Sequence, residues 1–332
     1  MFGRIGRVAN MFAVYAESFS TEDPLAGLGL GERPDPEPQE GWTTVTVKAA
    51  ALNHHDLWSL RGVGLREEAL PMTLGCDAAG YDEDGNEVVV HAVVKDPAWA
   101  SDETLDPKRS LLSERYQGTF ADKVLVPSGN VIPKPASLSF EEAACLPTAW
   151  LTAYRMLFTQ GQLKPGDTVL VQGAGGGVAT ALIALARAGG LRVYATSRDE
   201  AKRTRALDLG ASAVFESNER LPEKVDAVME TVGKATWSHS IKALRPGGAL
   251  VVSGTTSGPN PDNAELTRIF FLQLRVVGST MGTRAELGSL VNLLDVSGVR
   301  PVIDQVLPMT EARQGFAAMA SGDVFGKIVF SR

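Results

Sequence analysis

Cysteine is nearly absent from this chain. Only Cys76 and Cys145 occur among 332 residues. This count excludes a framework of disulfides and a structural zinc site built from four cysteines. So few thiols suit a reducing compartment, and we expect a cytoplasmic protein.

An excess of basic charge is also lacking, as is any long hydrophobic run. The net charge of −7 gives no general reason to expect nucleic-acid or bilayer binding. No apolar run reaches the roughly 20 residues that span a membrane, because Arg187 interrupts the longest candidate. The first residues also lack the apolar core of a secretory signal peptide. We therefore expect a small-molecule substrate, with neither nucleic acid nor a membrane as partner.

The first third of the chain is typical of a β-rich domain. Residues 1–10 are expected to form a loose extension, and Met11 is a candidate for the true start. Strand-forming runs follow in "AVYAES" and "TTVTVKAAAL", and a hairpin is expected around residues 84–86. The stretch between those two runs, "GLGLGERPDPEPQEG", contains three closely spaced prolines and is expected to be a loop.

From Asp167 onward the pattern changes to alternating strands and helices. "DTVLVQG" predicts a buried strand, followed by a helix over residues 177–188, a second strand "RVYATS" and a helix ending at Gly210. Further strands are expected in "AVFE", "VDAVMETVG", "GALVVSGTT" and residues 274–280. This series predicts an α/β fold with a doubly wound parallel sheet.

A glycine-rich turn lies between the first of these strands and its helix. Glycine permits a tight turn and lets backbone amides approach a pyrophosphate, while the helix N-terminus favours negative charge. The alternative is a packing turn that binds no ligand. The placement between strand and helix favours dinucleotide binding by Gly173, Ala174, Gly175, Gly176, Gly177 and Val178.

The end of the second strand bears on the choice of dinucleotide. Proteins that select NAD usually have Asp or Glu there, bonded to the ribose 2′-hydroxyl. This chain has Ser197, followed by Arg198 and, one turn later, Lys202. Cationic side chains suit a 2′-phosphate, and the sequence predicts NADPH as cofactor. Asp199 and Glu200 leave open the alternative of a charge-balanced helix start.

Several segments together resemble the medium-chain dehydrogenase/reductase superfamily, and most of all its zinc-free quinone oxidoreductase-like branch, which includes zinc-type alcohol dehydrogenase-like proteins. The segments are "ALNHHDLWSLRG", "LPMTLGCDAAG", "LPTAWLTAYRML", "VLVQGAGGGVA" and "GKIVF". The resemblance implies a GroES-like β-rich catalytic domain combined with a Rossmann domain. It places the catalytic domain at residues 11–130 and 282–332 and the NADP(H)-binding domain at residues 131–281.

The resemblance also indicates how a metal would be held. The zinc ligands of related alcohol dehydrogenases fall on Asn53, Cys76 and Thr148, and only Cys76 keeps a ligand type. His54, His55, Cys76, Asp77 and Cys145 are the residues from which a different site would have to be built. Adjacent histidines on an extended chain point to opposite sides, so at most one would face it. Because catalytic zinc needs about three protein ligands, we expect no bound metal.

Without zinc, the substrate must spread its own negative charge, as quinones and α,β-unsaturated carbonyls do. In the substrate cleft we expect Asn53 as a donor and His55 as a proton donor, with loop orientation and simple packing as their alternatives. The resemblance places other residues around the cofactor. They are Thr152 near the nicotinamide, Gly254, Thr255, Met281 and Gly282 around its carboxamide, Thr231 on the adenosine side and Lys327 near the cleft.

Three functions stay open at this point. The leading one is an NADPH-dependent oxidoreductase that transfers hydride to a quinone or an enone without a metal. The others are a zinc-dependent alcohol dehydrogenase and an NADPH-binding protein without catalysis. The resemblance further implies a homodimer, or a dimer of dimers, in which the last Rossmann strand pairs across a two-fold axis.

Overall fold

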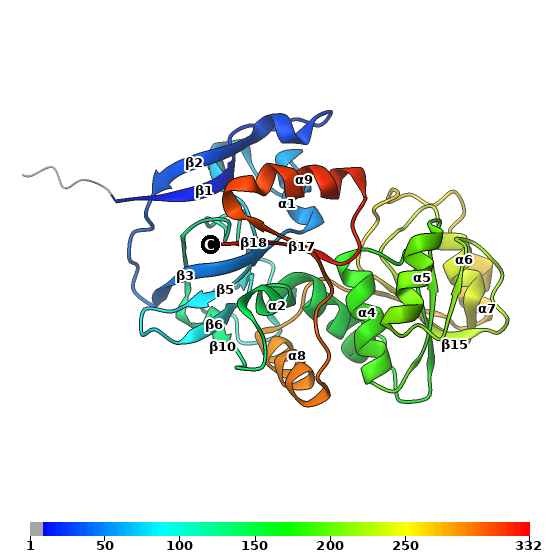
Figure 1. Cartoon of the computed structure of the whole chain (residues 1–332). Coiled ribbons are helices and arrows are strands. Elements are labelled where there is room, and N and C mark those ends of the chain that lie inside the picture. Colours follow the sequence, from blue (N-terminus) through cyan, green and yellow to red (C-terminus); the bar gives the residue numbers. More distant parts are fainter. Residues whose placement is uncertain (1–8) are drawn as a thin grey trace, which may run out of the picture. The chain divides into compact units, whose positions relative to one another are not determined.

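The computed structural model describes residues 9–332. The chain divides into two compact units (Figure 1). The first comprises residues up to Pro147 together with Gln305–Asp323 and Ile328–Arg332, and the second comprises Thr148–Asp304 and Val324–Lys327. Of the expected N-terminal extension, residues 1–8 lie outside the described part, and Asn10 already begins a strand.

These units divide at Pro147 and Asp304, whereas the expected boundaries fall at residues 130 and 281. Val131–Pro133 pairs with Glu87–Val90 of the first unit, which keeps residues beyond 130 there. At the other end, the side chain of Glu286 accepts from Arg155 and Thr159, and this holds residues beyond 281 to the second unit. The assignment of function to each domain stays a prediction.

The first unit is β-rich, as expected. Its main sheet has the order β10-β6-β5-β3-β18-β17, with β9 also paired to β3, and smaller sheets are formed by β2-β1-β4 and β7-β8. A buried aromatic cluster of Phe120, Phe316 and Phe330 brings the C-terminal helix and strand onto this sheet. The strands are β1 Asn10–Ala16, β2 Leu28–Pro34, β3 Trp42–Ala51, β4 Met72–Thr73, β5 Asp77–Tyr81, β6 Glu87–Val90, β7 Val93–Val94, β8 Ser110–Leu111, β9 Lys123–Pro127, β10 Val131–Pro133, β17 Ile303–Pro308 and β18 Lys327–Ser331. The helices are α1 His54–Leu60, α2 Phe140–Ala144 and α9 Ala312–Ser321.

The expectation of a loop after the first strand is wrong for residues 28–34. These residues form β2, which pairs antiparallel with β1 along its whole length. One glycine of this strand makes room for an aromatic ring, since a Cβ atom at Gly29 would lie 2.4 Å from the ring of Tyr15. Pro34 is the last residue of this strand, a position where the missing N–H costs little.

The second unit contains the predicted doubly wound sheet. Its six parallel strands have the order β13-β12-β11-β14-β15-β16. The chain winds outward from β11 in one direction and then restarts at β14 in the other, so a crevice is expected where the carboxyl ends of β11 and β14 diverge. The strands are β11 Thr168–Val171, β12 Arg192–Thr196, β13 Ala213–Phe215, β14 Val225–Glu230, β15 Leu244–Val252 and β16 Arg275–Gly278. The helices are α3 Leu151–Tyr154, α4 Gly177–Ala188, α5 Glu200–Leu209, α6 Trp237–Ala243, α7 Leu266–Phe271 and α8 Arg284–Ser297.

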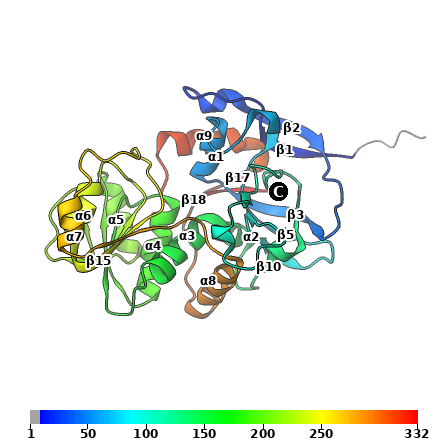
Figure 2. The same cartoon turned by 180° about the vertical axis from the view of Figure 1, so that it is seen from behind.

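Helices cover both faces of this second sheet. α4 and α5 pack on one another and on β11, β12 and β13, while α6 packs on α7, β14 and β15. The two groups can be followed in Figures 1 and 2. Right-handed crossovers that wind in opposite directions from the middle of a sheet place their helices on opposite faces. Among the described residues, no helix combines the length and the apolar character needed to cross a bilayer.

Candidate dinucleotide and active-site residues

The glycine turn of the second unit is built as predicted from the sequence. Gly173 and Gly175 have φ of 75° and 131°, in the region that favours glycine. Helix α4 begins at Gly177, with Gly176 as its exposed N-cap. A Cβ atom added at Gly176 would meet nothing within 4 Å. Space is therefore open beside the N-cap of a helix of twelve residues, and a helix N-terminus suits an anionic group.

Two lysines lie beside this turn. A Cβ atom at Gly175 would be 2.9 Å from Cδ of Lys202, and one at Gly177 would be 2.8 Å from Cδ of Lys327. Lys327 is only 2% exposed. The structure thus brings together the predicted glycine residues and both predicted lysines, and the glycine amides with Lys327 suit a pyrophosphate.

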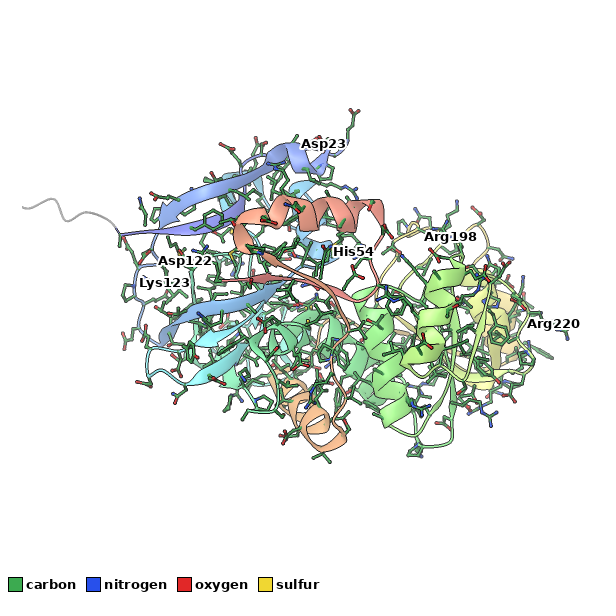
Figure 3. All side chains as sticks on the ribbon, viewed as in Figure 1. Asp23, His54, Asp122, Lys123, Arg198 and Arg220 are labelled. Atoms are coloured by element: carbon green, nitrogen blue, oxygen red, sulfur yellow. The ribbon has the colours of Figure 1, made fainter. Side chains whose placement is uncertain are left out.

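The end of β12 carries no carboxylate. Ser197 is buried, and its hydroxyl accepts from the Asp199 amide at 3.2 Å. Asp199 caps α5 by accepting from the Lys202 amide at 3.1 Å, so its charge is directed to a helix N-terminus. Arg198 is exposed on the surface just before α5 (Figure 3). The cation is therefore accessible at the position where the sequence predicts a 2′-phosphate.

The other predicted cofactor residues lie in neighbouring loops. Thr231 follows β14, and its carbonyl accepts from the Thr256 amide in the loop that contains Gly254 and the exposed Thr255. Gly282 is buried against Leu151, whose Cγ would lie 2.6 Å from an added Cβ atom. Beside it, Met281 has φ of 49° and is buried. Thr152 is buried in α3, next to Leu151.

A buried polar network under the glycine turn was not predicted. Glu230, at the end of β14, accepts from the amides of Val232 and Gly233 at 2.7 and 2.9 Å. It also accepts from the hydroxyls of Thr236 and Ser240 at 2.8 and 2.6 Å. Its burial follows from the chain's path, and the only sequence signal is an acid at a strand end in "VMETVG". These bonds fix the loop that carries Thr231.

In the first unit, Asn53 lies at the start of α1. Its amide nitrogen donates to Oδ2 of Asp77 at 2.9 Å and to the Ala51 carbonyl at 3.2 Å. Its backbone amide donates to the Asp56 carboxylate, which also accepts from the Gly75 amide at 3.0 Å. The side chain of Asn53 therefore has the loop-orienting role that sequence analysis left as its alternative, and its role toward a substrate stays a prediction.

His55 links a buried thiol to a carboxylate. Its Nδ1 lies 3.5 Å from Sγ of Cys76, and its Nε2 lies 3.2 Å from Oε1 of Glu114. The thiol donates to the Leu112 carbonyl at 3.2 Å, and the carboxylate accepts from the Leu111 amide at 3.0 Å. The two histidines lie in α1 and not on an extended chain as expected, and the preceding His54 is exposed (Figure 3), so only one of them joins this cluster.

The acidities in this cluster are strongly altered. Burial disfavours the imidazolium of His55, but Cys76, Glu114 and Asp56 outweigh it, and the pKa of His55 lies well above 6.5. Burial would raise the pKa of Glu114, yet the bonds from His55 and the Leu111 amide lower it overall. Burial raises the pKa of the Cys76 thiol more than His55 lowers it. His55 therefore lies between two groups that favour its charged form, Cys76 and Glu114.

The residues at the family's zinc position do not fit a catalytic zinc site. Nitrogen, oxygen and sulfur atoms of His55, Asp56 and Cys76 lie within 4.8 Å of one another. However, both carboxylate oxygens of Asp56 already accept backbone amides. The Asn53 amide is bonded to Asp77, and an amide is a poor zinc ligand. Of the family's ligand positions Asn53, Cys76 and Thr148, only Cys76 therefore keeps a zinc-ligating side chain, where about three are required.

Comparisons with known proteins agree with this fold. The model of the zinc-binding dehydrogenase family matches residues 177–296, and that of the alcohol dehydrogenase GroES-like domain matches residues 39–136. The chain is 28% identical to the quinone oxidoreductase of Mus musculus, covering 86% of this chain and 88% of that protein. It is 28% identical to the acryloyl-coenzyme A reductase of Sulfurisphaera tokodaii, covering 92% and 97%. A solved structure described as an NAD-dependent alcohol dehydrogenase has 33% identity and a TM-score of 0.89, covering 97% of this chain and all of that one.

The chain belongs to the medium-chain dehydrogenase/reductase superfamily, in its quinone oxidoreductase-like branch. The predicted α/β fold, with a GroES-like and a Rossmann-like part, is confirmed. Membership makes the protein an oxidoreductase of this superfamily.

Proposed function

We propose that this chain reduces quinones or α,β-unsaturated carbonyl compounds with NADPH and without a catalytic metal. The observation that carries the proposal is the cluster at the family's zinc position. There, Asn53 is bonded to a carboxylate, and the pKa of His55 is raised by its neighbours Cys76 and Glu114. A protonated imidazole can stabilise and then neutralise an oxyanion, which is the task that zinc performs elsewhere.

The preference for NADPH rests on the second unit. The glycine turn and Lys327 suit the pyrophosphate, while Ser197, Arg198 and Lys202 suit the 2′-phosphate. When bound, the reduced nicotinamide supplies a hydride. Thr231, Gly254, Thr255, Met281 and Gly282 would line the remainder of the dinucleotide.

The roles of the first unit's residues follow from their bonds. Hydride addition to the β-carbon of an enone moves the π electrons to the carbonyl oxygen. The Nε2–H of His55 then turns from Glu114 to that oxygen and transfers its proton to it. His55 is afterwards reprotonated from solvent through its exposed edge. The His55 side chain is 18% exposed, which permits that return. Asp77 orients Asn53, and Thr152 is proposed to contact the substrate end of the nicotinamide.

Steady-state assays test the proposal. Purified protein is offered NADPH or NADH with a panel of quinones, simple enones and enoyl thioesters, the last suggested by the relative that reduces acryloyl-coenzyme A. We expect turnover with NADPH that survives dialysis against a chelator. Tight stoichiometric zinc with chelator-sensitive alcohol oxidation would instead favour a zinc-dependent alcohol dehydrogenase. NADPH binding with no turnover on any acceptor would favour a non-catalytic binding protein.

The place of action is part of the same proposal. Cys76 and Cys145 are both buried and form no disulfide, which suits a reducing compartment. We infer a cytoplasmic protein, and fractionation of cells that express the tagged chain tests this.

A further inference from the structure

A short C-terminal segment, Val324–Lys327, lies on the glycine turn of the second unit. The Gly326 amide donates to the Gly175 carbonyl at 2.8 Å. The side chain of Lys327 lies against Gly177, at the first turn of α4. This segment therefore borders the turn, as Lys202 does at Gly175.

The path of the segment is fixed by its own contacts. Gly326 has φ of 108°, and an added Cβ atom would lie 2.3 Å from the Val302 carbonyl oxygen. That carbonyl accepts from the Lys327 amide at 2.9 Å. Phe325 is almost fully buried, and its amide donates to Oδ1 of Asp304 at 3.2 Å.

Arg205 of α5 anchors the segment from outside. Its guanidinium carbon lies 4.1 Å from the centroid of the Phe325 ring, at stacking distance. Its Nη1 lies 3.6 Å from the same Asp304 oxygen that accepts from Phe325. Since a guanidinium stacks on an aromatic ring and pairs with a carboxylate at once, one exposed residue ties α5 to the segment.

The geometry points to a role for Arg205 and Phe325 as a positioning pair for dinucleotide binding. By holding Gly326 and Lys327 against Gly175 and Gly177, the pair keeps the turn in the conformation that receives the pyrophosphate. A turn that must be ordered at each binding event binds more weakly than one already ordered. This inference rests on the proposed function, because it needs a dinucleotide on the glycine turn.

The experiment measures NADPH binding and turnover in Arg205→Met, Arg205→Lys and Phe325→Leu. We expect Kd for NADPH to rise about three- to tenfold in Arg205→Met, the range set by a partly exposed cation–π pair and its ion pair. KM for NADPH should rise by a similar factor, while kcat at saturating cofactor stays within about twofold of that of the unchanged protein. Arg205→Lys keeps the charge but loses the planar stack, and should recover only part of the affinity. The double variant Arg205→Met/Phe325→Leu should bind NADPH no more weakly than the weaker of the two single variants, because both changes break the same contact.

The matched control is Arg192→Met. Arg192 is similarly exposed and paired with Glu223 at 2.8 Å, but it lies at the start of β12, away from the carboxyl ends of the strands. It should bind NADPH as the unchanged protein does. If Arg205→Met and Phe325→Leu also keep full affinity, or lose kcat and not affinity, the positioning role is wrong while the proposed function stands. If the unchanged protein binds neither NADPH nor NADH, both fail.

Discussion

The fold changes the acidity of His55 in the direction that the proposed reaction needs. Its pKa is raised well above 6.5, and that of its partner Glu114 is lowered. A histidine with a raised pKa contributes stability that is complete below about pH 6.5 and is lost as the pH rises through the folded value. His55 loses the proton that the proposed reaction needs over the same pH range, so activity should fall as the pH rises through the folded pKa of His55.

Glu114→Gln tests this dependence. Removing the carboxylate lowers the pKa of His55, so the alkaline limb of kcat/KM should move to lower pH. For each pH unit by which the limb moves, kcat/KM at a pH above the limb should drop about tenfold. The control is Glu87→Gln, which breaks an ion pair with Lys134 elsewhere in the same unit. A pH profile that coincides with that of the unchanged protein would contradict a role for His55 as acid.

Ser197→Asp tests the choice of dinucleotide. A carboxylate at the end of β12 accepts bonds from a ribose 2′-hydroxyl and repels a 2′-phosphate. We expect the ratio of kcat/KM for NADPH to that for NADH to fall by about one to two orders of magnitude. Ser297→Asp, at the exposed end of α8, adds the same charge and should leave the ratio unchanged. An unchanged ratio in Ser197→Asp would show that the 2′-phosphate is bound elsewhere.

At the scale of elements, the carboxyl ends of the central strands are joined by buried polar bonds. The Thr196 hydroxyl, at the end of β12, donates to the Gln172 side chain at 2.6 Å, beyond the end of β11. Gln172 in turn donates to the Ser240 hydroxyl of α6 at 2.9 Å, and Ser240 donates to Glu230 of β14. The loops that would receive the dinucleotide are therefore held by the same network.

Glu230→Ala should destabilise this arrangement strongly. It leaves two backbone amides and two hydroxyls without their buried acceptor, and each such loss costs about 1–3 kcal/mol when no water replaces it. We expect the free energy of unfolding to fall by about 3 kcal/mol or more, measured by urea titration. Asp208→Ala removes an exposed carboxylate of α5 in the same unit and should change the free energy of unfolding by less than about 1 kcal/mol. Equal, small losses in both variants would refute the structural role of the network.

At the scale of the molecule, one face of the second unit has features of an interface. Among the described residues, β16 pairs only with β15 and so forms an edge of the sheet. Val276 on this edge is 44% exposed, and Phe270 and Phe271 on the preceding helix are 69% and 77% exposed. Unpaired edges and exposed aromatic side chains are usually covered. We propose that a second copy covers them, with β16 pairing across a two-fold axis.

Val276→Lys combined with Phe271→Lys should prevent this association. The two introduced lysines of one copy would lie close to those of the other across the axis, and repulsion between like charges disfavours pairing. Light scattering at micromolar concentration should give a dimeric or larger mass for the unchanged protein and a monomeric mass for the variant. Val306→Lys, at a similarly exposed valine of β17, should keep the larger mass. A monomeric unchanged protein would contradict the proposal.

Much of this architecture could be predicted from the sequence because it depends on local pattern. The helix predicted over residues 177–188 is α4, the predicted helix ending at Gly210 is α5, and the hairpin near Asp84 joins β5 to β6. The strand β2 was missed because glycine and proline are usual in loops, and the reason for Gly29, the ring of Tyr15, is visible only in the folded chain.

The order of residues is enough to predict the alternation of strands and helices, the glycine turn, and the missing carboxylate after the second Rossmann strand. These depend on residue type and on near neighbours along the chain. Tertiary structure alone decided that Glu114 would hold His55, 59 positions away, and that Gly326 would bond to Gly175. Such contacts depend on how distant segments return to one another, because a side chain's type does not specify its partner.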